Sequence, residues 1–160
     1  MGIKVFAPAS IGNVGVGFDI MGLALERPGD EVIARKSDTP GLRIAKITGH
    51  GGKLPYEAEK NTAGVAVLRL LEHLGEADRG IELDIHKKMP LGSGLGSSAA
   101  SAVAAVLGVS ELLRTGLSKR ELLPFACAGE QIASGSFHAD NVAPSMIGGI
   151  VLIRDNATLD

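Results

Sequence analysis

A glycine-rich stretch followed by two serines has the composition of a backbone that binds an anion. It covers residues 89–101, with a glycine at every second position from 92 to 96. Glycine lets the backbone approach a ligand closely, and Ser97 or Ser98 suits the N-cap of the alanine-rich helix that follows. Such a helix N-terminus presents unpaired N–H groups and the positive end of a dipole. The stretch therefore predicts either a tight turn before a helix or a phosphate-binding loop.

Two common nucleotide-binding motifs do not fit this stretch. A P-loop closes its glycine-rich turn with a lysine and a serine or threonine, and no lysine comes directly after Gly96. The dinucleotide-binding fingerprint has a different glycine spacing and an acidic residue at the end of the next strand. Lys87 and Lys88 precede the loop, where they could place a cation near phosphates or could be solvated charges at a strand end.

Two further stretches place polar side chains among small residues. Residues 10–25 have four glycines between positions 12 and 22, which excludes a regular helix. The polar residues are Asn13 and Asp19 in that stretch, and His138, Asp140, Asn141 and Ser145 in residues 135–149. Each stretch alone is explained by a turn in which Asn or Asp bonds its own backbone. Beside a candidate phosphate loop in one short chain, they favour a substrate site.

One acidic residue stands in small, apolar company. Glu130 follows Ala126, Cys127, Ala128 and Gly129 and precedes Ile132 and Ala133. A carboxylate buried there is costly unless a cation or a metal ion pairs with it, whereas an exposed one needs no partner. The residues alone leave both readings open.

These stretches are expected to be positioned by a mixture of strands and helices. Strands are predicted at residues 3–6, 30–36, 42–47 and 81–86, and residues 150–153 read as a buried strand. Helices are predicted at residues 63–74, with Asn61 as N-cap, and at residues 98–114. A capping box at residues 118–121 opens a third helix, which Pro124 is expected to kink or restart.

Composition bounds the class of protein. The 160 residues suit one domain or one half of a two-domain enzyme. Aromatic residues are 3% of the chain, so the core must be aliphatic, and a net charge of −2 gives no footprint for nucleic acid or an anionic membrane. The single cysteine, Cys127, excludes an intrachain disulfide. With no signal peptide or membrane-spanning run in the sequence, we expect a cytoplasmic protein.

The three polar stretches also resemble motifs of the GHMP kinases, a family of small-molecule kinases. The second motif of that family is matched by Pro90-Leu91-Gly92-Ser93-Gly94-Leu95-Gly96-Ser97-Ser98-Ala99-Ala100. Residues 10–25 are similar to the first motif, and residues 138–145 are similar to a stretch of the members that act on homoserine. The resemblance covers essentially all of the chain.

The resemblance implies the fold and the reaction of that family. Residues 1–160 would form an α+β N-terminal domain like domain 2 of ribosomal protein S5, with the family's C-terminal domain absent. The implied reaction is the ATP-dependent phosphorylation of the side-chain hydroxyl of L-homoserine, a step of threonine biosynthesis. A mevalonate-type kinase is the alternative within the family.

The resemblance also implies roles for individual residues. Residues 90–100 would bind the phosphates of ATP, with Lys87 near them and Asn61 near the base. Ser98 and Glu130 would be the protein ligands of Mg²⁺. The substrate would be oriented by Asn13, Asp19, His138, Asp140 and Asn141. Asp19 would face its ammonium group, and Asp140 and Asn141 would act in catalysis, with the use of a catalytic base left open.

The length of the chain departs from the family pattern. Complete enzymes are considerably longer, and their second domain supplies arginines for the substrate carboxylate. Three hypotheses therefore remain: half of a kinase, a nucleotide-binding module without turnover, and a purely structural domain. The surface that a second domain would cover could also drive formation of a homodimer.

Overall fold

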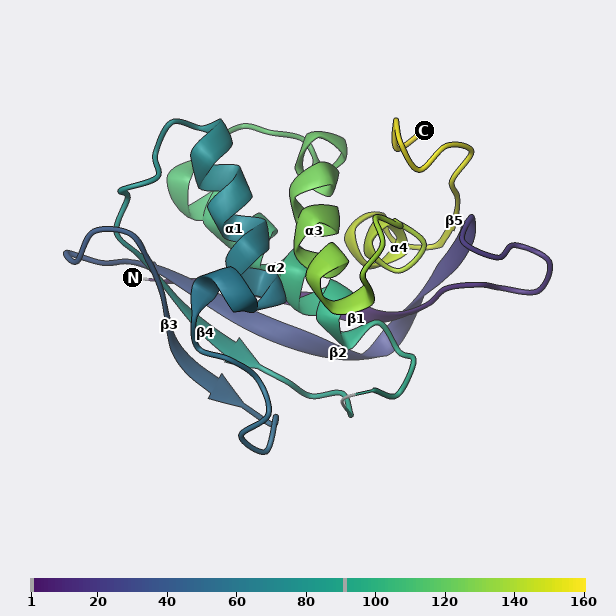
Figure 1. Cartoon of the computed structure of the whole chain (residues 1–160), viewed down its shortest axis with the longest axis horizontal. Helices are drawn as coiled ribbons and strands as arrows, with labels where there is room; N and C mark the ends of the chain where they lie inside the picture. Colours follow the sequence, from purple (N-terminus) through teal and green to yellow (C-terminus); the bar gives the residue numbers. More distant parts are fainter. Residues whose placement is uncertain (1, 91) are drawn as a thin grey trace.

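A mixed β-sheet carries the helices of the chain on one of its faces (Figure 1). The computed structural model describes residues 2–90 and 92–160. The strands are β1 (Gly2–Ile11), β2 (Met21–Lys36), β3 (Leu42–Thr48), β4 (Ile81–His86) and β5 (Ile150–Leu152). The helices are α1 (Thr62–His73), α2 (Ser97–Leu113), α3 (Lys119–Ser134) and α4 (Val142–Ile147), with a 3-10 helix at Ala58–Lys60. The predicted α+β class is confirmed.

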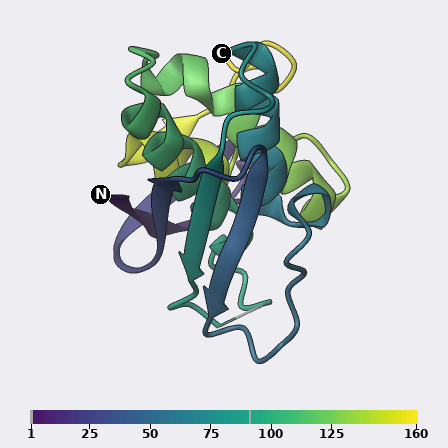
Figure 2. The same cartoon turned by 90° about the vertical axis from the view of Figure 1, so that its left-hand side faces the viewer.

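The strands are ordered β1-β2-β4-β3, and β5 pairs with the beginning of β2. Among the strands of the described residues, only β3 and β4 run parallel, side by side as Figure 2 shows. Parallel neighbours need a crossover connection, and α1 lies in the one between them. In β4 the residues alternate between buried and half-buried, as the sequence pattern predicts.

Strand β2 is longer than the predicted residues 30–36 because it has three partners. Its first residues pair with β5, its middle with β1 and its end with β1 and β4. Between the pairs Ser10–Ala24 and Pro8–Gly29 the register shifts, and Glu26 to Pro28 are exposed. A Pro-Gly pair reads locally as a turn, whereas the long-range pairing extends the strand through it.

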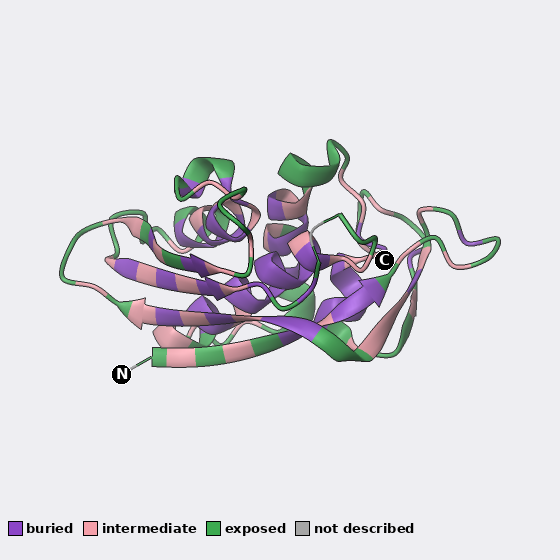
Figure 3. Ribbon diagram, turned by 90° about the horizontal axis from the view of Figure 1, so that it is seen from below, coloured by how far each residue is buried: buried purple, intermediate pink, exposed green. Residues whose placement is uncertain are grey.

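Helix α2 forms the centre of the core. It packs against β1 and β2 of the sheet and against α1 and α3 in the helical layer. Residues 99–106 are all buried, whichever side of the helix they lie on, and five of the eight are alanine. Small side chains let neighbouring elements approach on every side, so this helix is buried around most of its circumference. The far face of the sheet carries exposed and half-buried residues (Figure 3).

The helix ends show which local signals hold. Asn61 caps α1, because its Oδ1 accepts hydrogen bonds from the N–H groups of Ala63 and Gly64 at 3.0 and 3.5 Å. The capping box of Ser118 and Glu121 is also present. Of the two outcomes predicted at Pro124, the restart is wrong, since α3 continues through this residue to Ser134.

Two further predictions about the elements are corrected. The N-cap of α2 is Gly96 in a left-handed conformation, not Ser97 or Ser98, because both serine side chains bond to carboxylates elsewhere. Strand β5 is not buried: Ile150 and Leu152 are 76% and 55% exposed. It pairs with β2 only over Met21 to Leu23. Within residues 2–90 and 92–160, no helix is both long and apolar enough to span a membrane.

Candidate active site

The glycine-rich loop joins the end of β4 to the first turn of α2. Gly92, Gly94 and Gly96 have φ values of 70°, 73° and 65°, which favour glycine. A side chain at Gly96 would overlap Ser10 Oγ, so glycine also lets the loop lie against β1. Leu91 lies outside the described residues. The loop thus has the backbone that its sequence predicts, apart from the cap.

The first turn of α2 faces this loop. Its hydrogen-bond ladder begins with the Ala100 N–H donating to the Gly96 carbonyl at 2.8 Å. The N–H groups of Ser97, Ser98 and Ala99 precede that ladder, as they do at any helix N-terminus. Such groups favour a bound anion. The side chains of Ala99 and Ala100 are fully buried, so only their backbone could contribute.

A serine and a glutamate meet beside the loop. Ser98 Oγ donates to Glu130 Oε1 at 2.8 Å, and Glu130 Oε2 is buried with no hydrogen-bond partner among the described residues. Burial raises the pKa of Glu130, while the Ser98 hydroxyl and the charge of Lys87 oppose that rise. Mg²⁺ takes one or two protein oxygens together with phosphates and waters, and an orphaned carboxylate oxygen fits that donor set. The predicted pair therefore fits Mg²⁺.

Two adjoining hollows extend from this pair. One, of about 190 Å³, is lined by Asn61, Ile85 and Lys87, among others. The other, of about 460 Å³, lies along the loop and reaches Asn141. Both are lined by Leu54, Ser98 and Ala133, so the two hollows adjoin, and together we call them the groove. The Asn61 side chain lines this groove while it caps α1 and donates to the Pro55 carbonyl at 2.9 Å.

Polar residues of the two other stretches meet near Asn141, which lines the second hollow, whereas Ser145 Oγ donates to the Pro8 carbonyl at 2.8 Å. His138 Nδ1 lies 3.3 Å from Asp19 Oδ1, and Asn13 Oδ1 accepts from the Asp19 N–H at 2.8 Å. Asn141 Oδ1 accepts from Ser10 Oγ at 3.1 Å. A side chain at Gly12 would overlap the Asp140 carboxylate. The missing Cβ lets the 12–20 loop approach the 138–141 segment closely.

Two carboxylates near Asn141, those of Asp140 and Asp19, interact electrostatically. Burial raises the pKa of Asp140, and the negative charge of Asp19 raises it further. The nearby His138 opposes the rise. The carboxylates of Asp19 and Asp140 repel each other when both are charged. A ligand with an ammonium group would relieve that repulsion, so the pair suits such a ligand.

Asn156 holds these two segments together and has no counterpart in the sequence predictions. Its Nδ2 donates to the Asp19 carbonyl at 3.0 Å, and its Oδ1 accepts from the Ala139 N–H at 3.0 Å. A single asparagine in a terminal turn region carries no local signal of such a bridge. Only the tertiary structure brings it to the site.

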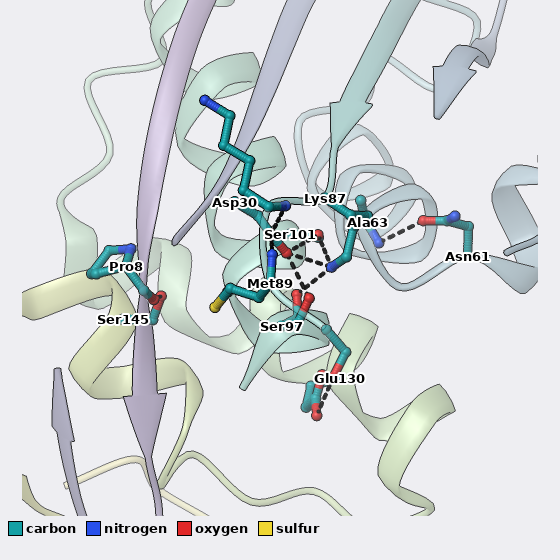
Figure 4. Close-up of polar contacts among 12 residues, drawn as sticks. Pro8, Asp30, Asn61, Ala63, Lys87, Met89, Ser97, Ser101, Glu130 and Ser145 are labelled. Atoms are coloured by element: carbon teal, nitrogen blue, oxygen red, sulfur yellow. Dashed lines mark hydrogen bonds and ion pairs between the residues drawn. The ribbon is translucent and has the colours of Figure 1, made fainter. Parts of the chain in front are cut away.

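A buried polar cluster under the glycine-rich loop was also not predicted (Figure 4). We call Asp30, Lys87, Ser97 and Ser101 the loop anchor; all are buried. Lys87 Nζ lies 2.5 Å from Asp30 Oδ2 and donates to the Ser97 carbonyl and to Ser101 Oγ at 2.6 and 2.7 Å. These three acceptors use all three N–H groups of the amine. Burial lowers the pKa of Lys87, and the Asp30 carboxylate opposes that change.

A glycine-rich loop at a helix N-terminus, an oxygen pair that fits Mg²⁺ and a polar cluster near Asn141 are the features expected of an α+β domain of the small-molecule kinase type. The comparison with protein families agrees. The chain belongs to the GHMP kinases: the family model described as "GHMP kinases N terminal domain" matches residues 61–149.

Several proteins are similar to this chain over nearly its whole length. A homoserine kinase of Chlorobium phaeobacteroides is 47% identical over 99% of the chain and 52% of its own length. A crystal structure of homoserine kinase from Cytophaga hutchinsonii, 56% identical, matches 99% of the chain and 50% of its own with a TM-score of 0.94. Mevalonate kinase of Methanococcus jannaschii, 18% identical with a TM-score of 0.77, shares the fold. The chain spans about half the length of the curated relatives it matches.

Proposed function

We propose that this chain is the nucleotide-binding half of an enzyme that phosphorylates the side-chain hydroxyl of L-homoserine with ATP, giving O-phospho-L-homoserine and ADP. The enzyme would act in the cytoplasm, in threonine biosynthesis. The observation that carries the proposal is the pair of adjoining hollows, one lined by Asn61 and the other by the glycine-rich loop and Asn141. The two hollows suit the two reactants, and the similarity to proteins named homoserine kinase supports the choice of acceptor.

The nucleotide would occupy the hollow near Asn61 with its base and ribose, and the loop with its phosphates. The positive-φ glycines turn the backbone of the loop, and the first N–H groups of α2 lie at its end. Phosphoryl transfer asks a protein mainly for positioning and charge neutralisation. Backbone N–H groups provide both here without a lysine in the loop.

Ser98 and Glu130 would hold Mg²⁺ beside the glycine-rich loop. When bound, the ion neutralises part of the phosphate charge. Glu130 is suited to this role because one of its oxygens is buried without a partner. Ser98 keeps the other oxygen in place through its 2.8 Å hydrogen bond.

The acceptor would lie near Asn141, beside Asp19. Asp19 would pair with its ammonium group, and Asn13 and His138 would hold that carboxylate in position. Asn141 lines the hollow along the loop, so its side chain would contact the reacting hydroxyl. Asp140 would orient the substrate beside it. The hydroxyl oxygen then attacks the γ-phosphorus in line, the bond to the β-phosphate oxygen breaks, and the hydroxyl proton is released.

The test is ADP release from Mg·ATP by this chain, with and without L-homoserine. Mevalonate serves as the alternative acceptor, and Asn141→Ala as the control for contaminating ATPase. Homoserine-dependent release that Asn141→Ala abolishes supports the proposal. Release that depends on mevalonate instead contradicts it.

A nucleotide-binding module without turnover is the second candidate, because the chain spans about half the length of its relatives. It predicts ATP binding without homoserine-dependent ADP release by this chain. The same assay on an enzyme of the relatives' full length that carries these residues then separates the candidates. Homoserine-dependent ADP release by that enzyme assigns the reaction to the complete protein, and no release means that the protein only binds ATP.

A further inference from the structure

The Asp30 carboxylate joins the two ends of the glycine-rich loop (Figure 4). Its Oδ1 accepts hydrogen bonds from the N–H groups of Lys88 and Met89 at 2.7 and 3.2 Å, just before the loop begins. Its Oδ2 accepts from Ser97 Oγ at 2.7 Å, just after the loop ends. One side chain, with 0% exposure, thus fixes where the loop leaves β4 and where it enters α2.

The sheet places Asp30 where it can do this. Glu31 in β2 pairs with His86, the last residue of β4. Asp30 therefore lies beside the residues that continue β4 into the loop. Its 0% exposure places it under the loop and not in solvent. The position depends on a strand pairing and not on the loop sequence.

A loop rich in glycine needs such an anchor. Glycine loses more conformational freedom on ordering than any other residue, so an unanchored loop would spend binding energy on becoming ordered. Fixing both ends to one rigid carboxylate removes part of that loss before the ligand arrives. The loop anchor thereby acts on phosphate affinity from beneath the binding surface.

Lys87 has a second effect, on charge. An unpaired carboxylate under the first turn of α2 would repel a bound phosphate and offset the helix dipole. The ammonium group at 2.5 Å from Asp30 Oδ2 neutralises it, and its side chain is 2% exposed. Because its N–H groups already have three acceptors, the amine is held away from a direct phosphate contact.

We propose that Asp30 and Lys87 are positioning residues for the nucleotide phosphates: Asp30 clamps both ends of the glycine-rich loop, and Lys87 acts through Asp30 without touching the phosphates. The proposal rests on the proposed function, since it takes the loop to be the ATP-phosphate site. It predicts effects that scale with the phosphates of the ligand and spare the nucleoside.

The first experiment compares the affinities of this chain for Mg·ATP and for AMP by calorimetry. In Asp30→Asn we expect ATP affinity to fall about tenfold, the size of a lost charge-assisted hydrogen bond, and AMP affinity to stay within about twofold. The matched control is Asp84→Asn. Asp84 pairs with Arg35 at 2.6 Å across the same two strands, at a half-buried position of β4 that has no bond to the described residues of the loop, and should leave both affinities unchanged.

A double-mutant cycle separates a direct contact from action through Asp30. Lys87→Met should weaken ATP binding in the wild-type background and have little further effect in the Asp30→Asn background. Equal losses in both backgrounds would mean that Lys87 contacts the phosphates itself, and would overturn the proposal. Wild-type chain that binds no ATP would overturn the proposed function together with this inference.

Ser97→Ala keeps the experiment informative if Asp30→Asn does not fold. It removes only the bond at the end of the loop and leaves the ion pair in place. We expect a smaller loss of ATP affinity, with AMP affinity unchanged. Wild-type ATP affinity in a folded Ser97→Ala chain would show that the clamp does not act on the phosphates.

Discussion

Two loops of the candidate site are held in opposite ways. The glycine-rich loop is fixed by a buried ion pair and by bonds to buried serines, with Asp30 0% and Lys87 7% exposed. The 12–20 loop projects from the molecule, with Val16 and Phe18 102% and 72% exposed. It is held by backbone turns and by the bonds of Asn13 and Asn156.

The difference indicates how rigidity is divided within the domain. A buried ion pair gains little net stability from its own attraction, but leaving either charge unpaired is costly, so it enforces one geometry. Exposed hydrogen bonds exchange readily with water and enforce much less. The glycine-rich loop is thus held in one geometry, whereas the 12–20 loop is free to adjust when a substrate or another protein surface covers it.

The largest expected effect is on folding stability. Asp30→Ala leaves Lys87 buried without its partner and should lower the free energy of unfolding by about 3–5 kcal/mol. Asn13→Ala, in the 12–20 loop, removes one exposed bond and should cost about 1 kcal/mol or less. Urea unfolding followed by circular dichroism measures both. Similar losses for the two variants would show that the two loops do not differ in the way described.

The next effect concerns the metal ion. Glu130→Gln should raise the Mg²⁺ concentration needed for nucleotide binding by about tenfold or more, because the carboxylate is one of two candidate protein ligands. Its free energy of unfolding should not fall, since a neutral amide is less costly to bury than a charged carboxylate. Calorimetric titration of ATP at several Mg²⁺ concentrations measures the first, and thermal melting the second.

An unchanged metal titration in Glu130→Gln would remove Glu130 from the metal site. A large loss of stability with an unchanged titration would instead assign it a structural role. Glu121→Gln is a suitable control, because that carboxylate lies on the same helix, is exposed and bonds only at the capping box.

The same comparison shows what could be predicted from the sequence. Strand β4, the Asn61 cap and the capping box at Ser118 are carried by signals within a few residues, and each is confirmed. The glycine-rich loop was also found locally, because its function requires particular residue types in a row. Signals within a few residues of one another are therefore enough to predict the glycine-rich loop and the elements beside it.

What the sequence did not predict depends on partners distant in the chain. Asp30 has the position of the first residue of an alternating strand, yet its partners, from Lys87 to Ser101, are 57 to 71 residues away. Ser98 reads as a cap, but its hydroxyl bonds to Glu130. Asn156 bonds a loop 137 residues earlier. The roles of the predicted site residues in catalysis stay predictions.

A smaller effect is expected at the proposed acceptor site. Asn156→Ala removes the bridge between the 12–20 loop and the 138–141 segment, and should raise the KM for homoserine by about three- to tenfold, the size of one or two hydrogen bonds. The KM for ATP should not change. Steady-state kinetics of a complete enzyme carrying these residues measures both constants. Asn156→Asp keeps the acceptor for Ala139 and should lose less; equal increases in both KM values would mean that the bridge does not belong to the acceptor site alone.

The smallest effect is electrostatic, and it tests whether the two segments lie as close as described. Because the folded chain raises the pKa of Asp140 above 3.8, this carboxyl binds its proton more tightly folded than unfolded. Its contribution to stability is therefore present on the acid side and is lost as the pH rises from that value through the raised pKa.

Asp19→Asn removes the second cause of the shift, so the pKa of Asp140 should fall only part of the way, since burial is the larger cause. His138→Ala removes an opposing charge and should raise it. Carbon-13 NMR titration of Asp140 resolves the two directions, and a pKa that responds to neither variant would mean that the 12–20 loop does not approach the 138–141 segment in solution.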